Sequence, residues 1–78
     1  MFNLDQYIAR YPDFPKPGIT FYDMSPMLED HHALTSCVNA LVDLARPYQP
    51  DLIVGLDARG FLFLTPVALA LNAGAIMI

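Results

Sequence analysis

The sequence has a single cysteine and few basic residues. Cys37 has no second cysteine to pair with, so an internal disulfide is excluded and we expect a reducing, cytoplasmic compartment. Four residues are basic and eight are acidic, which gives a formal net charge of −4. Nucleic-acid surfaces need clustered lysine and arginine, so we expect no nucleic-acid partner. The first residues also lack the basic start and apolar stretch of a signal peptide.

Charge is absent altogether from residues 60–78. A helix of that length can cross a hydrocarbon core about 30 Å thick. Pro66, Asn72 and Gly74 interrupt the run, however, and no basic residue follows it to anchor an interface. We therefore interpret it as a buried helix followed by a buried strand and expect no membrane association. A membrane-anchored tail is the alternative interpretation, and it predicts recovery in the membrane fraction.

The N-terminal third is rich in proline. Residues 2–10 are predicted to form a short helix with Phe2, Tyr7 and Ile8 available for burial. Residues 11–18 hold three prolines and end on a glycine, a composition that excludes helix and predicts a stiff, extended turn segment. Residues 19–22 are β-prone, and the pair Ser25-Pro26 is expected to turn the chain again. At 78 residues the chain supports one small domain of marginal stability.

The rest of the chain alternates between helix and strand. Asp30 is the expected N-cap of a helix that ends near Arg46, because apolar residues then recur at spacings of three and four. Residues 51–56 predict a buried strand and residues 75–78 a second one. Between them, residues 61–71 predict a buried helix in which Pro66 causes a kink or the helix starts only near Thr65. This order indicates an α/β fold with a parallel sheet.

The loop after the first predicted core strand is the best candidate for a binding site. Asp57-Ala58-Arg59-Gly60 lies between a strand and a helix, at the sheet edge where open α/β folds bind ligands. A helix start suits phosphate, and the Arg59 guanidinium matches phosphate oxygens. Asp57 can hold Arg59 or accept from a ribose hydroxyl or a hydrated metal ion. The alternative is an exposed Asp57–Arg59 pair, worth under about 1 kcal/mol.

Two long segments resemble adenine phosphoribosyltransferases, in the right order and at the right spacing. Residues 14–30 (FPKPGITFYDMSPMLED) resemble the N-terminal segment of those enzymes, and residues 54–63 (VGLDARGFLF) resemble their first core strand and the loop after it. The resemblance implies the N-terminal part of a type I phosphoribosyltransferase fold, truncated. It assigns residues 1–28 to an N-terminal helix and base-binding hood, and residues 29–78 to the first β/α units of an incomplete core.

The resemblance also implies a reaction. Adenine and 5-phosphoribosyl-1-pyrophosphate would give AMP and pyrophosphate, with Mg²⁺, in a cytoplasmic homodimer. Asp57, Ala58, Arg59 and Gly60 would bind the pyrophosphate, and the Asp57–Ala58 peptide is the candidate for a non-proline cis bond of the kind such enzymes often have. Another purine phosphoribosyltransferase is an alternative. A second is a non-catalytic interaction fragment that needs a partner chain to cover its strand edges.

The adenine site is implied at Thr20, Phe21 and Tyr22. Backbone groups of Thr20 and Tyr22 would contact the edge of the base, and Phe21 would stack on its face. Plain core packing is the alternative role for Phe21. Two residues depart from the family pattern: Tyr22 replaces a basic residue, and Leu64 replaces a small one, usually glycine. The catalytic motifs of the family are expected after Ile78, so we predict no catalytic residue and no turnover in these 78 residues.

Four polar or reactive residues are set aside. His31 and His32 are adjacent and would point in different directions on a helix, so we expect no metal site. Cys37 lies on the apolar stripe and is interpreted as a small core residue rather than a nucleophile. Asp23 is expected to cap a turn rather than to act in catalysis.

Overall fold

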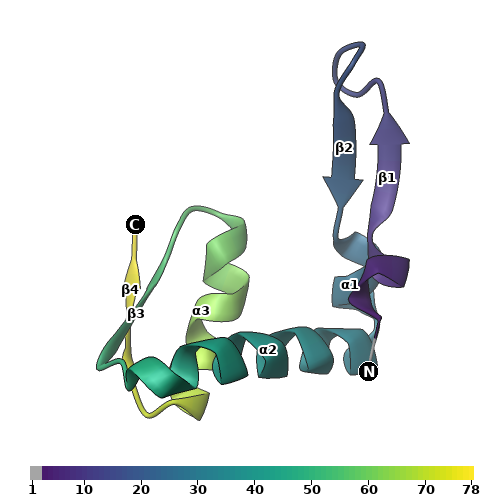
Figure 1. The fold of residues 1–78 in the computed structure, drawn as a ribbon. Helices are drawn as coiled ribbons and strands as arrows, with labels where there is room; N and C mark the ends of the chain where they lie inside the picture. Colours follow the sequence, from purple (N-terminus) through teal and green to yellow (C-terminus); the bar gives the residue numbers. More distant parts are fainter. Residues whose placement is uncertain (1–2) are drawn as a thin grey trace. The chain divides into compact units, whose positions relative to one another are not determined.

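A computed structural model describes residues 3–78 and divides the chain into two compact units, Met1–Cys37 and Val38–Ile78. The boundary between the units falls inside the helix α2 (His31–Ala45). Figure 1 shows the elements of each unit. Phe2, for which burial was predicted, lies outside the described residues.

The first unit is built around a β-hairpin. A 3-10 helix, η1 (Leu4–Tyr7), precedes strand β1 (Ala9–Pro12), which pairs antiparallel with β2 (Thr20–Asp23) (Figure 1). The β-prone segment predicted at residues 19–22 is thus a strand, but the helix predicted through residue 10 is wrong in its second half. Pairing with β2 holds residues 9–12 extended, and a local sequence pattern does not show such a partner.

The hairpin loop, residues 13–18, is tied by hydrogen bonds. The Phe14 amide donates to the Ile19 carbonyl at 3.0 Å, and the Gly18 amide donates to Asp13 Oδ1 at 2.9 Å. Gly18 has a φ of +87°, which glycine adopts without steric penalty. The Phe14–Pro15 peptide is cis. The stiff turn predicted from the prolines is therefore confirmed, although its first two residues belong to β1.

Ser25-Pro26 begins a helix instead of a turn. The short helix α1 (Ser25–Glu29) has its proline in the first turn, where a missing N–H removes no helical hydrogen bond. Asp23 Oδ1 accepts from the Ser25 amide at 2.9 Å and from Ser25 Oγ at 2.7 Å, so Asp23 ends the strand and fixes the start of the helix. Met27 of α1 is buried in this unit.

Helix α2 begins where the sequence predicted. Asp30 Oδ2 accepts from the Ala33 amide at 3.0 Å, which confirms Asp30 as its N-cap. The helix ends at Ala45, and the 3-10 helix η2 (Arg46–Tyr48) follows, with Gln49 in the left-handed region at φ 48°. Pro47 lies in the first turn of η2, which agrees with the predicted helix end near Arg46.

Replacing Asp30 with alanine is expected to lower the free energy of unfolding by about 0.5–2 kcal/mol. The Ala33 amide loses its acceptor in this change, and Ala33 itself is fully buried. Urea denaturation followed by circular dichroism measures the loss. The variant Asp30→Asn keeps a side-chain oxygen and should lose little. Equal losses in the two variants would contradict the capping role.

The second unit holds a parallel pair of strands. β3 (Leu52–Gly55) pairs with β4 (Gly74–Met77) in the register Val54 opposite Ile76 (Figure 1). The ladder extends one residue further, because the Ile78 amide donates to the Gly55 carbonyl at 3.0 Å. Both predicted core strands and their parallel direction are confirmed, but their predicted burial is wrong. In β3 only Gly55 is buried, and every residue of β4 is exposed.

Helix α3 (Arg59–Ala70) joins the two strands and packs against both. Pro66 lies inside it, so the alternative of a start near Thr65 is wrong. Asn72 ends the helix in the left-handed region at φ 55°, while the Ala73 amide donates to the Ala68 carbonyl at 2.9 Å. This six-to-one bond is the C-terminal motif that lets a chain leave a helix sharply.

Only one face of this parallel pair is covered by α3. Gly55 faces the helix, and its neighbour Val54, on the opposite face, is 50% exposed. The other exposed apolar side chains of that face are Leu52, Leu56, Ile76 and Ile78. Within residues 3–78, no helix is long and apolar enough to cross a membrane.

Candidate functional site

The loop Asp57-Ala58-Arg59-Gly60 lies at the carboxyl end of β3 and at the start of α3. The Asp57 amide donates to the Ile78 carbonyl at 2.8 Å, so the end of β4 anchors the loop. The Phe61 amide donates to the Ala58 carbonyl at 3.1 Å and closes the first turn of the helix. The Asp57–Ala58 peptide is cis, as the family resemblance predicted. The loop therefore occupies the position that its sequence pattern indicated.

Two backbone donors of this loop have no acceptor among the described residues. They are the amides of Ala58 and Gly60, at the N-terminal end of α3. Unpaired amides and the helix dipole favour an anion at such a position. The Arg59 side chain is exposed beside them and supplies a full positive charge. Together these groups have the chemistry of a phosphate site.

Two glycines and a leucine set the shape of this corner. A Cβ added to Gly55 would lie 3.0 Å from the Gly60 carbonyl oxygen and 3.0 Å from Leu64 Cβ. Leu64 is 4% exposed, so it fills the space against Gly55 on the covered face of β3. Leu64, which departs from the family pattern, is thus a core residue directly behind the loop.

The residues predicted to bind adenine form most of β2. Thr20 lies opposite Pro12, which has no N–H, so this pair cannot exchange two backbone hydrogen bonds. In an antiparallel ladder, residue pairs that exchange backbone hydrogen bonds alternate with pairs that do not. Phe21 and Asp23 therefore occupy the positions of β2 that are hydrogen-bonded to β1. The backbone groups of Thr20 and Tyr22 then point away from β1. Within the described part of the chain, no strand pairs with that edge of β2.

The Phe21 side chain lies on the face of the hairpin that carries aromatic rings. Phe21 is opposite Tyr11, and its ring meets that of Phe14 edge to face, with centroids 5.4 Å apart and planes at 74°. Tyr11, Phe14, Phe21 and Asp23 line a cavity of about 290 Å³. Phe21 is partly exposed, so it is not a plain core residue.

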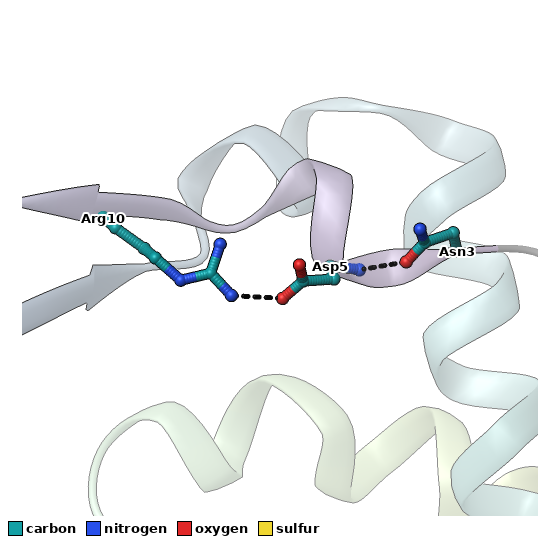
Figure 2. Close-up of polar contacts among 3 residues, drawn as sticks. All are labelled: Asn3, Asp5 and Arg10. Carbon is teal, nitrogen blue, oxygen red and sulfur yellow. Dashed lines mark hydrogen bonds and ion pairs between the residues drawn. The ribbon is translucent and has the colours of Figure 1, made fainter.

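The opposite face of the hairpin carries a charged cluster that the sequence did not reveal. Arg10 lies opposite Tyr22, and its guanidinium stands 5.4 Å from the centre of the Tyr22 ring. Arg10 also forms an ion pair with Asp5, whose amide donates to Asn3 Oδ1 (Figure 2). The hydrogen bond to Asp5 raises the pKa of Arg10 above its ordinary value. Arg10, the cross-strand neighbour of Tyr22, thus places a positive charge over the Tyr22 ring.

Of the four residues set aside in the sequence, Asp23 lines the cavity beside Phe21, whereas the other three belong to neither the loop 57–60 nor that cavity. His31 and His32 begin α2, and within residues 3–78 no group of three histidine, cysteine, aspartate or glutamate residues is placed to hold a metal ion. Cys37 is half-buried in α2, and burial raises the pKa of its thiol. A raised pKa leaves less thiolate and lowers nucleophilicity.

The known proteins to which the chain is similar share one name. No family model matches the sequence. The chain is 51% identical over 72 residues to the adenine phosphoribosyltransferase of Desulfitobacterium hafniense, covering 92% of this chain and 42% of the relative. It is 46% identical over 76 residues to that of Kosmotoga olearia, covering 97% of this chain and 45% of the relative.

Solved structures give the same result. The crystal structure of adenine phosphoribosyltransferase from Thermoanaerobacter pseudethanolicus superposes with a TM-score of 0.86 at 38% identity, over 95% of this chain and 44% of that one. The Saccharomyces cerevisiae enzyme, complexed with an imino-altritol bisphosphate and adenine, gives 0.84 at 35% identity, over 95% of this chain and 46% of that one. By sequence and by fold, this chain is similar to adenine phosphoribosyltransferases over more than nine tenths of its own length, and it spans a little under half the length of the relatives that it matches.

Proposed function

We propose that these residues hold the adenine base and the pyrophosphate group in an enzyme of purine salvage. The reaction joins adenine to the ribose C1′ of 5-phosphoribosyl-1-pyrophosphate, releases pyrophosphate and gives AMP. In this proposal residues 1–28 are the base-binding hood, and residues 29–78 are the first β/α units of the core. The loop 57–60 carries the proposal, because it offers unpaired amides and an arginine at the carboxyl edge of a parallel sheet.

Pyrophosphate is the ligand that this loop suits. The amides of Ala58 and Gly60 can donate to its oxygens, and Arg59 can add a charge-assisted pair of bonds. The Asp57 amide already donates to Ile78, so the Asp57 backbone anchors the loop while the other three residues present donors. A leaving group that carries several negative charges is stabilised by such fixed donors.

Adenine is the ligand proposed for β2. The outward backbone groups of Thr20 and Tyr22 provide both a donor and an acceptor, which is what the amino edge of adenine requires. Phe21 supplies a ring for stacking. The relatives that the chain matches are named as enzymes of this one activity, which favours adenine over another purine and a catalytic parent over an interaction fragment.

Mg²⁺ is proposed to arrive with the phosphoribosyl substrate. The described residues hold no group of three protein ligands, but Mg²⁺ commonly binds through substrate phosphates, waters and one or two carboxylates. Asp57 is the carboxylate of this loop. We further propose a cytoplasmic homodimer as the working form of the enzyme. Because the catalytic motifs of the family are expected after Ile78, residues 1–78 are proposed to give no turnover.

Substrate binding tests the proposal on the 78-residue chain itself, by ¹⁵N NMR titration. Pyrophosphate is expected to shift the amide signals of Ala58 and Gly60, and adenine those of Thr20 and Tyr22. The substitution Arg59→Ala should weaken pyrophosphate binding at least tenfold, since charge-assisted bonds contribute about 1.5–3 kcal/mol. It should leave adenine binding unchanged.

Hypoxanthine provides the matched control for the base. Its oxo group replaces the amino donor of adenine, so it should shift the same signals only at much higher concentration. Equal binding of the two bases would contradict adenine specificity. Pyrophosphate binding that survives Arg59→Ala unchanged, or shifts confined to other residues, would contradict the assignment of loop 57–60.

A further inference from the structure

The hairpin contains an aromatic residue with no role in the proposed site. Phe14 belongs to the loop between β1 and β2 and is 53% exposed. Because about half of its surface is exposed, burial of the Phe14 side chain contributes little to the stability of the fold. Its ring nevertheless meets Phe21 edge to face, at 5.4 Å and 74°, a favoured geometry for two aromatic rings.

The backbone that carries Phe14 is held in place independently of this contact. The Phe14 amide donates to the Ile19 carbonyl at 3.0 Å, and the Ile19 amide donates to the Lys16 carbonyl at 3.2 Å. Asp13 Oδ1 accepts from the Gly18 amide at 2.9 Å. These three bonds tie the loop to itself and to the start of β2. The Phe14 ring is therefore presented to Phe21 from a fixed position.

We propose that Phe14 is a positioning residue for base binding, which sets the ring plane of Phe21 through their edge-to-face contact. This rests on the proposed function, in which Phe21 stacks on adenine. A partly exposed phenylalanine on a two-stranded hairpin can rotate among its rotamers, and each unproductive rotamer lowers the affinity for a flat ligand. Phe14 restricts those rotamers before the base arrives. The sequence resemblance did not assign this role to Phe14, because the role is inferred from the distance between the two rings in the structure.

The test compares three variants of the 78-residue chain by NMR titration with adenine. Phe14→Leu keeps the apolar volume and removes the ring, and it should weaken adenine binding about two- to tenfold, the range that an aromatic pair contributes. Phe14→Tyr keeps the ring and should bind adenine like the unsubstituted chain. Tyr48→Leu makes the same kind of change at an exposed ring in the second unit and should have no effect. The Phe21 ring protons should shift in Phe14→Leu and not in Tyr48→Leu.

Each result decides the matter. Unchanged adenine affinity in Phe14→Leu, or a loss in Phe14→Tyr as large as in Phe14→Leu, would overturn the positioning role and leave the proposed function intact. Loss of the dispersed β1–β2 amide signals in Phe14→Leu would also overturn it, since Phe14 would then be needed for folding. If adenine shifts nothing in the unsubstituted chain, the proposed base site itself is wrong.

Discussion

Replacing Gly55 with alanine is expected to unfold most of the second unit. The added Cβ would lie 3.0 Å from the Gly60 carbonyl oxygen, 3.0 Å from Leu64 Cβ and 3.1 Å from Leu64 Cδ2. The first of these is backbone at the start of α3, so the helix and the strand must separate. Overpacking of this kind costs about 1–3 kcal/mol. A chain of this size has only a few kcal/mol of stability in total.

Gly74→Ala is the matched control, because it makes the same substitution in the paired strand. Its Cβ would meet Leu52 Cδ2 at 3.0 Å, and that atom is the far end of an exposed side chain that can move. Amide hydrogen exchange of β3 and β4 measures both variants. Protection should collapse in Gly55→Ala and persist in Gly74→Ala. Similar protection in the two variants would contradict the close approach of Gly55 to α3.

The substitution Gly55→Ala should also displace the backbone of loop 57–60 in molecules that remain folded. Gly60 lies in the loop, and its carbonyl is the backbone atom that the new methyl group would displace. The double variant Gly55→Ala with Leu64→Ala removes the contact with Leu64 Cδ2 and retains the contacts with the Gly60 carbonyl oxygen and with Cβ of residue 64. It should therefore not restore the lost protection. Full recovery would show that Leu64 Cδ2 alone limits the size of residue 55.

The second large effect is expected at the uncovered face of the parallel pair. This face is an apolar surface without charge. It is formed by Leu52, Val54 and Leu56 on the β3 side and by Ile76 and Ile78 on the β4 side. Parallel strands are normally covered on both faces, and exposed apolar patches of this kind drive association. We expect the 78-residue chain to associate at micromolar concentration in analytical ultracentrifugation, and Val54→Lys to shift it largely to monomer.

Leu69→Lys controls for the added charge. Leu69 is 71% exposed, but it lies on α3, which packs on the opposite face of the strands. It should leave the association unchanged. If both lysine variants dissociate the chain equally, net charge rather than the sheet face controls association.

Much of the chain from Asp30 onward could be predicted from the sequence because its signals are local. The cap at Asp30, the apolar strand before Asp57 and the helix after it all follow from residues within one or two turns of each other. The first unit was predicted less well. Residues 9–10 were assigned to a helix, and their strand conformation depends on pairing with residues 22–23, twelve or more positions away.

Contacts between side chains in the candidate site could not be predicted from local sequence patterns. The Phe14–Phe21 pair and the Arg10–Tyr22 pair each join residues that approach only when the hairpin closes. Leu64 was noted as a departure from the family, but its contact with Gly55 depends on how α3 packs on β3. Such contacts depend on register and packing, which no single-residue preference encodes.

The sequence by itself determined the resemblance to adenine phosphoribosyltransferases, the alternation of helix and strand, and the position of loop 57–60, because each depends on residue order and spacing. Tertiary structure decided the rest. Antiparallel pairing turned the outward backbone of β2 toward solvent and brought Phe14 to Phe21, and parallel pairing brought Ile78 to the Asp57 amide. These contacts join residues distant in sequence, and the chain forms them only when the gain from packing and pairing offsets the entropy of closing the loops between them.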